Sequence, residues 1–349
     1  MQRTRFESIG RYTPETILST EELFSRLRVQ DLPPLREFSG VRNRRIYDSH
    51  PDRYESSFQL ASRAAQDCLR KSDYTADQLD VVISASISRS VGAGIYCLEP
   101  SLALLVGNAI GSTRARHFDV ANACAGMITG ILVLDRMIRA GVVRNGLVVS
   151  GEQITPVVET ALREIRSMSS DQFAALSVGD AGAAVVVDGR GDDADEIHYV
   201  ELMTVSDGAE YCLGMPSDRT NGLALYTDSH AMQDEVGFFR AVNRFATFLE
   251  ETNRDFEAER FDFFIYHQFS DQAIAHGQKV AEQYFGTPMP PTLDILCEYG
   301  NTASTSHFVA LYEHLARRNI PKGSKILLLP QASGLVTGYL SATVSRLEA

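Results

Sequence analysis

The feature that most constrains this chain is a series of short apolar runs, each continuous rather than alternating. They lie at Asp80–Ser86, Gly146–Ser150, Ala183–Asp188, Phe263–His267 and Lys325–Pro330. Such runs are typical of strands covered on both faces, because none of their side chains meets water. Helical patterns stand around them, at residues 56–71, 124–140, 236–251, 271–285 and 304–318. Strands that alternate with helices predict an α/β fold.

A faint internal repeat accompanies this pattern. The polar stretch Gly189–Glu196 divides the chain near its middle, and the run Leu79–Ser86 before it resembles Phe261–His267 after it. Each run is followed by a helical stretch, a turn of small residues and a final apolar strand. The offset between the two copies stays at roughly 180 residues, which favours a duplication over a solenoid. We therefore predict two halves, residues 1–188 and 197–349.

Composition excludes several classes of protein. The 349 residues are 44% hydrophobic, enough to bury a large core. A net charge of −12 argues against nucleic acid and anionic membranes as partners, and the apolar runs are shorter than the roughly 20 residues of a membrane span. No secretory signal pattern is present. Five scattered cysteines without a CxxC pair argue against disulfides and zinc, so we expect a cytoplasmic protein without a metal.

Cys124 is the first candidate for chemistry. It lies in the segment Phe118–Met127, where a short strand turns into an apolar helix. The positive end of a helix is expected to lower the pKa of a thiol and stabilise its thiolate. Backbone N–H groups there can also bind the oxyanion of an attacked carbonyl. Cys124 is thus a candidate nucleophile, the alternative being a buried cysteine that acts only as a small hydrophobic residue.

His267 and Asn301 are the other candidates. His267 ends the predicted strand Phe263–Tyr266, at the edge where α/β proteins place ligands, and its Nε2–H could reach a thioester carbonyl. Asn301 follows Gly300 at a helix start, where asparagine usually serves as an N-cap. Its amide could instead donate to an acyl oxygen. The histidines within helical patterns are predicted to be structural: His276, His307 and His314.

In combination these residues resemble the ketoacyl synthase III branch of the thiolase superfamily, over nearly the whole chain. The matching segments are Ser39–Ile46, Glu99–Ser101, Asp119–Gly126, Val178–Ala184, Tyr266–Gln268 and Gly300–Ala303. The family's Cys, His and Asn correspond to Cys124, His267 and Asn301. The resemblance implies a thiolase fold, in which two similar five-stranded halves form an α-β-α-β-α sandwich. It also implies a homodimer and no cofactor.

The resemblance implies a Claisen condensation of acyl thioesters, carried by acyl carrier protein or coenzyme A, in fatty acid or polyketide-type biosynthesis. Cys124 attacks a first thioester, and the backbone N–H groups of Cys124, Ser333 and Gly334 hold the oxyanion. A second thioester then places its carbonyl against His267 and Asn301, which stabilise its enolate. This carbon attacks the acyl-Cys124 and gives a β-ketoacyl product.

The enolate has two possible origins, loss of CO2 from a malonyl group or removal of an α-proton. The segments Ser86–Arg89 and Cys97–Pro100 resemble the head-to-head condensing enzymes of olefin and β-lactone biosynthesis, in which a glutamate of the partner subunit removes an α-proton. Glu99 stands at the matching place, 25 residues before Cys124. A buried carboxylate with a raised pKa would suit this task. Alternatively, Glu99 only caps or charges the start of a helix over residues 100–110.

The substrate contacts are less defined. The chain has no tryptophan and carries Phe38 where initiating synthases often have arginine, so their mode of coenzyme A binding is not expected. The arginines at 42, 44 and 45 could meet a phosphorylated carrier, although a solvated turn explains them equally well. Segment 205–235 is expected to line the acyl pocket. The residues predicted to contact substrate are Arg42, Arg45, Tyr211 and Met215.

Two other functions compete with condensation. Some relatives pass the acyl group from the cysteine to an oxygen or nitrogen nucleophile, in which case His267 would be the general base. The presence of Asn301 favours condensation, because such transferases often alter that position. A non-catalytic partner subunit of a synthase is the third reading, and the intact set of Cys124, His267 and Asn301 argues against it.

Overall fold

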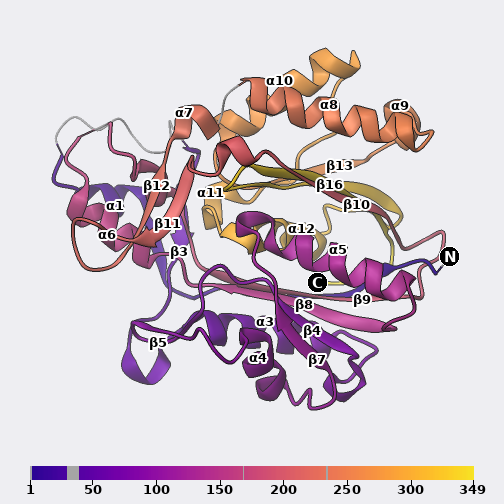
Figure 1. The fold of residues 1–349 in the computed structure, drawn as a ribbon, viewed down its shortest axis with the longest axis horizontal. Coiled ribbons are helices and arrows are strands. Elements are labelled where there is room, and N and C mark those ends of the chain that lie inside the picture. Colours follow the sequence, from indigo (N-terminus) through magenta and orange to yellow (C-terminus); the bar gives the residue numbers. More distant parts are fainter. Residues whose placement is uncertain (1, 30–38, 168, 233–234) are drawn as a thin grey trace.

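The computed structural model describes residues 2–29, 39–167, 169–232 and 235–349. Two sheets and the helices around them are stacked in five layers (Figure 1). Helices α3 (Ser57–Arg70) and α4 (Leu102–Ile110) cover the outside of the first sheet, and α8 (Glu235–Glu251) and α10 (Asp271–Phe285) cover the outside of the second. Helices α5 (Gly126–Arg139) and α12 (Ser306–Ala316) lie between the sheets. The predicted α/β class and duplicated five-layer sandwich are confirmed.

The first sheet has five strands in the order β1-β9-β8-β4-β7. Strand β4 pairs in parallel with both β7 and β8, whereas β9 pairs antiparallel with β1 and β8. The carboxyl ends of β4, β7 and β8 therefore meet at one edge, the edge at which ligands bind in α/β folds. The strands are β1 (Arg5–Tyr12), β4 (Val81–Ser84), β7 (Arg116–Asp119), β8 (Asn145–Glu152) and β9 (Ala181–Asp188).

The second sheet repeats this order as β10-β16-β14-β13, and the short β15 also pairs with β16. The predicted count of five strands is confirmed, but the fifth strand is the short β15, and the place that β7 holds in the first sheet is reduced to a single bridge between Phe264 and Thr292. Pro290 and Pro291 precede Thr292, and prolines have no N–H to give to a ladder. The strands are β10 (Glu196–Thr204), β13 (Phe263–Tyr266), β14 (Ser324–Leu329), β15 (Gln331–Ala332) and β16 (Val336–Val344).

The main hydrophobic core lies between the two sheets and is shared by both halves of the chain. Helix α5 contributes Met127 and Ile131, and helix α12 contributes Phe308 and Leu311, all of them fully buried. Strand residues of both sheets close the core from above and below. The strands of the first sheet end at Asp188 and those of the second begin at Glu196, which is where we propose to divide the chain.

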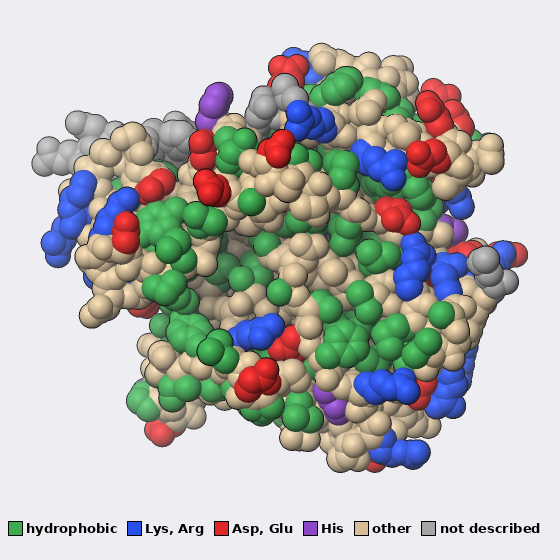
Figure 2. All heavy atoms as spheres, in the orientation of Figure 1, with side chains coloured by type: hydrophobic (Ala, Val, Ile, Leu, Met, Phe, Trp, Pro, Cys, Tyr) green, Lys and Arg blue, Asp and Glu red, His purple; other side chains and the backbone are tan. Residues whose placement is uncertain are grey.

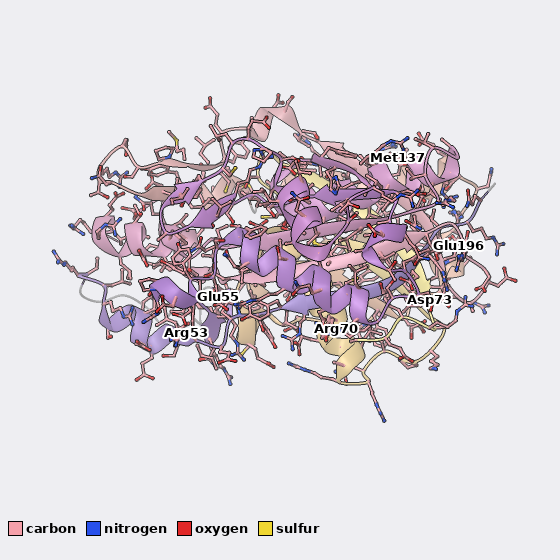
Figure 3. All side chains as sticks on the ribbon, turned by 90° about the horizontal axis from the view of Figure 1, so that it is seen from below. Arg53, Glu55, Arg70, Asp73, Met137 and Glu196 are labelled. Atoms are coloured by element: carbon pink, nitrogen blue, oxygen red, sulfur yellow. The ribbon has the colours of Figure 1, made fainter. Side chains whose placement is uncertain are left out.

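Helix α3 lies unusually close to the first sheet, because glycines of the sheet face it. A Cβ on Gly151 of β8 would come within 2.1 Å of the Ser57 carbonyl oxygen, and one on Gly182 of β9 within 2.2 Å of the Leu60 carbonyl oxygen. The two glycines are direct partners in the β8–β9 ladder. Figure 3 shows α3 from below, between the labelled Glu55 just before its start and Arg70 at its end.

In the described part of the chain, three two-stranded sheets and several short helices complete the fold. Among the described residues, no helix is long and apolar enough to cross a membrane. The two-stranded sheets are β2 (Ile17–Ser19) with β3 (Asn43–Arg45), β5 (Ser90–Gly92) with β6 (Ile95–Tyr96), and β11 (Cys212–Pro216) with β12 (Leu223–Thr227). The short helices are α1 (Thr20–Ser25), α6 (Pro156–Glu164), α7 (Ser229–Met232), α9 (Phe256–Glu259) and α11 (Leu296–Tyr299).

Candidate active site

Cys124 lies on a sharp turn between β7 and α5. The turn is the 3-10 segment η3 (Ala123–Ala125), which precedes the helix proper. Ala123 has a φ of 45°, a left-handed conformation that is costly for any residue but glycine. Gly126 lets the turn approach the first sheet, because a Cβ there would meet the Ala85 carbonyl oxygen at 2.7 Å. The backbone thus places the thiol at the head of a buried helix, as predicted.

Asn301 lies at the equivalent turn of the second half, just before the 3-10 segment η6 (Ala303–Thr305). Its backbone bonds to the first half, donating to the Ser177 carbonyl and accepting from the Gly179 N–H. Its side-chain oxygen accepts a hydrogen bond of 2.9 Å from the Ala303 N–H. That bond points the amide nitrogen away from the backbone, so Asn301 can donate to a ligand. Thr302 occupies the N-cap position of η6, without a side-chain cap hydrogen bond.

His267 directly follows β13, and its backbone N–H donates to the Leu329 carbonyl of β14. The imidazole is buried and stacks between Phe269 and His307, with ring centroids 5.7 and 5.8 Å away. His307 belongs to α12, so a histidine predicted to be structural supports the candidate catalytic one. Burial and the neighbouring His307 hold the pKa of His267 well below its ordinary value. At neutral pH the ring is therefore neutral, with one donor and one acceptor nitrogen.

Cys124, His267 and Asn301 line one cavity of about 740 Å³. Its walls come from both halves of the chain and from the hairpin β11–β12. Figure 2 shows a hollow bordered by hydrophobic side chains beside this hairpin, on the left of the molecule. The structure thus brings together the three residues that are far apart in the sequence.

The cavity wall is nearly free of charge. Arg89 is the one lining residue of the described chain that carries a formal charge, and its guanidinium lies 3.5 Å from the Asp119 carboxylate. Asp119 in turn accepts hydrogen bonds from the backbone of Leu102 and Ala103 at the start of α4. The remaining wall consists of apolar, hydroxyl, amide and thiol groups and the imidazole of His267. Such a cavity suits an acyl chain and its thioester carbonyl.

The predicted lowering of the Cys124 pKa is wrong for the empty cavity. Desolvation by the surroundings raises the pKa of this thiol, and the nearby Cys212 and Glu152 add to the rise. The cause is that an anion loses hydration in an apolar wall, and this loss outweighs the field of one helix end. The thiol is therefore protonated at neutral pH. Its proton must leave as the nucleophile attacks, and the acceptor nitrogen of a neutral imidazole such as His267 suits that transfer.

Of the other predicted site residues, some line the cavity and others do not. Ser333 lines the cavity, in the turn between β15 and β16. The preceding residue, Ala332 of β15, packs on η3. Gly334 is the next residue of that turn but is absent from the lining. Met215 of β11 also lines the cavity, whereas Tyr211, directly before β11, does not.

The predicted arginine contacts lie away from this cavity. Neither Arg42 nor Arg45 lines it, and Arg45 donates to the Glu15 carbonyl at 3.2 Å. Arg44 is fully buried and donates to Thr20, so it is no part of a surface patch. Burial lowers the pKa of Arg44 to about 10. Phe38 lies outside the described residues.

Glu99 lies at the rim rather than inside. It is exposed and follows Cys97 and Leu98, which do line the cavity. The capping part of the alternative for Glu99 is wrong, because α4 begins at Leu102 and its N-cap is Ser101, whose hydroxyl accepts from the Leu104 N–H. That the charge of Glu99 favours the start of α4 stays a prediction.

The prediction that segment 205–235 lines the pocket is confirmed at Cys212. Sequence reasoning missed several other lining residues, among them Arg89, and one buried acid. Glu152 lies in the buried strand β8, and a charged residue at the end of an apolar run was the signal that could have found it. Within the described part of the chain, no group of three or more His, Cys, Asp or Glu could hold a metal ion.

Two family models match the chain. Residues 118–208 match 3-oxoacyl-[acyl-carrier-protein (ACP)] synthase III, and residues 252–343 match the C-terminal part of the same family. The first segment contains Cys124, and the second contains His267 and Asn301. Together the two segments cover more than half of the chain.

Similar proteins agree with this assignment. The β-ketoacyl-[acyl-carrier-protein] synthase III of Clostridium novyi is 28% identical over 355 residues, covering 97% of this chain and 98% of the relative. That of Deinococcus deserti is 29% identical over 345 residues, covering 94% of this chain and 87% of the relative.

Solved structures show the same fold at lower identity. OleA of Xanthomonas campestris, in a glutamate-to-glutamine variant, has a TM-score of 0.83 at 24% identity, covering 98% of this chain and 97% of its own. The 3-oxoacyl-[acyl-carrier-protein] synthase III of Aquifex aeolicus has a TM-score of 0.79 at 22% identity, covering 97% and 99%. With both family models matched in order, the chain belongs to the 3-oxoacyl-[acyl-carrier-protein] synthase III family of the thiolase superfamily, and it is a condensing enzyme of the acyltransferase class.

Proposed function

We propose that this enzyme joins two acyl thioesters head to head through an acyl-Cys124 intermediate. The observation that carries the proposal is the convergence of Cys124, His267 and Asn301 on one almost uncharged cavity. In the first half-reaction, the sulfur of Cys124 attacks the thioester carbonyl, and the carrier leaves as a free thiol. The N–H groups of Cys124 and of the Ser333–Gly334 turn face the oxyanion in this proposal.

In the second half-reaction, another thioester places its carbonyl oxygen against His267 and Asn301. The neutral imidazole and the amide each offer one N–H, which stabilises an enolate without adding a charge that must be desolvated. The enolate carbon forms a bond to the acyl carbonyl carbon, and the bond to Cys124 sulfur breaks. The product is a β-ketoacyl thioester, and the enzyme returns to the free thiol.

The enolate requires either decarboxylation or a base, and the cavity favours a base from outside. Among the described lining residues there is no carboxylate, and the one cation that could bind a malonyl carboxylate, Arg89, is already paired with Asp119. Glu99 stands at the rim on the segment that follows hairpin β5–β6. This segment and its hairpin expose Ile95, Tyr96 and Leu98 by 60%, 42% and 81%, so they form an apolar surface that a second copy of the chain would cover.

We therefore assign Glu99 of a partner subunit as the base that takes the α-proton of the second acyl chain, in a homodimer. A carboxylate that becomes buried on dimerisation gains basicity as it loses hydration. The structure of OleA that was solved with bound lauric acid and lauroyl-CoA has a TM-score of 0.83 to this chain at 23% identity. It suggests lauroyl-CoA as a first substrate to test, with acyl carrier protein as the other carrier.

The test is intact-mass analysis after incubation with lauroyl-CoA, followed by identification of the released product. The wild type is expected to gain one lauroyl group, Cys124→Ala none, and a β-keto thioester of doubled chain length should form from lauroyl-CoA alone. A product that forms only after malonyl-CoA is added would refute head-to-head condensation and leave the acyl-Cys124 step standing. Transfer of the lauroyl group to added alcohols or amines without a new C–C bond would instead make the protein an O- or N-acyltransferase.

A further inference from the structure

Glu152 is a buried carboxyl group that the proposed mechanism does not use. It is the last residue of β8, has no exposed surface and is absent from the cavity lining. Within the described part of the chain, no cation lies within ion-pair distance of it. A buried, unpaired carboxylate is costly, so its hydrogen bonds and its position need an explanation.

Five hydrogen bonds converge on the two oxygens of Glu152. Oε1 accepts from the Ile87 N–H at 2.9 Å, the Ser150 hydroxyl at 3.0 Å and the Ser304 hydroxyl at 2.5 Å. Oε2 accepts from the N–H and the hydroxyl of Ser88, at 3.2 and 3.1 Å. These donors favour the charged carboxylate, although burial raises the pKa of Glu152.

Besides Ser150 of its own strand, Glu152 accepts from two segments that contribute residues to the cavity wall. Ile87 and Ser88 belong to the loop after β4 and line the cavity themselves. Ser304 belongs to the second half of the chain and is the middle residue of η6, the turn whose first N–H, that of Ala303, holds the side chain of Asn301. Glu152 is therefore the carboxylate that ties the Asn301 turn to the wall of the first half.

The same residue lies close enough to the nucleophile to act on it through space. The negative charge of Glu152 contributes to the raised pKa of Cys124, after desolvation and Cys212. Replacing the carboxylate by an amide of the same shape should therefore make the thiol easier to ionise.

We propose that Glu152 is a positioning residue for the condensation, and that through Ser304 it holds the Asn301 amide where the enolate oxygen of the second acyl group forms. This inference rests on the proposed function. Ser304→Ala removes one link and keeps the charge, whereas Glu152→Gln keeps the shape and removes the charge. Ser341→Ala, which deletes a buried hydroxyl of β16 away from the cavity, is the matched control.

Three rates separate the roles: acylation of Cys124 by lauroyl-CoA, turnover of the condensation, and alkylation of Cys124 by iodoacetamide at pH 8. For Ser304→Ala we expect acylation within about twofold of wild type and condensation slower by about tenfold, because one hydrogen bond that positions a transition-state donor is lost. Its alkylation rate should stay near that of wild type. For Glu152→Gln we expect alkylation faster by about threefold or more together with slower condensation. Ser341→Ala should match wild type in all three.

The proposal is overturned if Ser304→Ala leaves condensation unchanged or slows acylation and condensation equally, or if folded Glu152→Gln condenses as fast as wild type. If Glu152→Gln does not fold, as judged by circular dichroism, Ser304→Ala decides the matter alone. The failure of the proposed function has a different signature, since wild-type enzyme would then gain no lauroyl group on Cys124.

Discussion

Ala123 and Ala303 have the same left-handed backbone conformation, with φ angles of 45° and 53°, each one residue before the middle of a 3-10 turn. The middle residue is Cys124 in the first turn and Ser304 in the second. The two turns lead into the two central helices, α5 and α12, so they are equivalent positions of a duplicated fold. The side chain of Cys124 lines the cavity, whereas the hydroxyl of Ser304 donates a hydrogen bond to Glu152.

Replacement of Asn301 by alanine should separate the two half-reactions. We expect condensation to fall by about 10²- to 10³-fold, the usual cost of removing one donor to a developing oxyanion, while acylation of Cys124 continues. Quantifying the lauroyl adduct and the product in the same samples measures both. An equal loss of both half-reactions would place Asn301 in the first step and contradict its assignment to the enolate.

The assignment of Glu99 to the partner subunit can be tested with mixed dimers purified through two different tags. A dimer that combines Cys124→Ala in one chain with Glu99→Ala in the other should have one complete site and about half the wild-type turnover. That site is formed by the intact Cys124 of one chain and the intact Glu99 of the other.

The reverse arrangement provides the control. A dimer of one wild-type chain and one chain with both substitutions should be inactive, because the remaining Cys124 then faces a partner without Glu99. If this second dimer is active and the first is not, Glu99 serves its own chain.

The lowered pKa of His198 predicts how the free energy of unfolding depends on pH. Burial, and then the nearby Lys325, lower the pKa of His198 to about 4, whereas an unfolded chain would have a value near 6.5. Between these values the unfolded state binds the proton and the folded state does not. Stability is therefore complete above pH 6.5 and falls as the pH drops towards 4.

We expect this histidine to account for about 1–2 kcal/mol of that loss, allowing for its partial exposure. Urea unfolding of wild type and His198→Asn at pH 7.0 and 4.5 measures the difference. The variant should lose less stability between the two pH values than wild type does. Equal losses would show that the proton does not distinguish the folded from the unfolded state at this position.

The contact between α3 and the first sheet predicts opposite effects for one kind of substitution. Gly151→Ala or Gly182→Ala should destabilise the fold by about 1–3 kcal/mol or more, because the new methyl group meets backbone atoms that cannot move aside. Gly237→Ala in α8 has open space at its Cβ and should stabilise by about 0.5–1 kcal/mol through helix propensity. Thermal and urea unfolding of the three variants, compared with wild type, tests the sign of each change.

The architecture was accessible from the sequence because its signals are local. Continuous apolar runs predicted β4, β8, β9, β13 and β14, and the helical patterns at 56–71 and 271–285 lie within one residue of α3 and α10. The start of α5 was predicted two residues early, since the left-handed Ala123 makes the first turn a 3-10 segment. Likewise, the reduction of the β7 equivalent in the second sheet to one bridge depends on how Pro290 and Pro291 interrupt a ladder.

The site was accessible only in part. Cys124, His267 and Asn301 each follow a strand or turn with a recognisable pattern, so their positions were predictable. The ionisation of Cys124 was not, because its pKa depends on burial by the tertiary structure and on groups such as Cys212 that are distant in the sequence. The arginine cluster misled for a similar reason: a charged run does not reveal that Arg44 turns inward while its neighbour Arg42 faces solvent.

The shared central layer determines whether either half of the chain could be stable alone. Helices α5 and α12 share one core, which both sheets close, so neither half can cover its own apolar face. A half-length ancestor would have left that face open to water and needed another copy of itself against it. Cutting this protein at residues 189–196 should therefore give fragments that are insoluble apart.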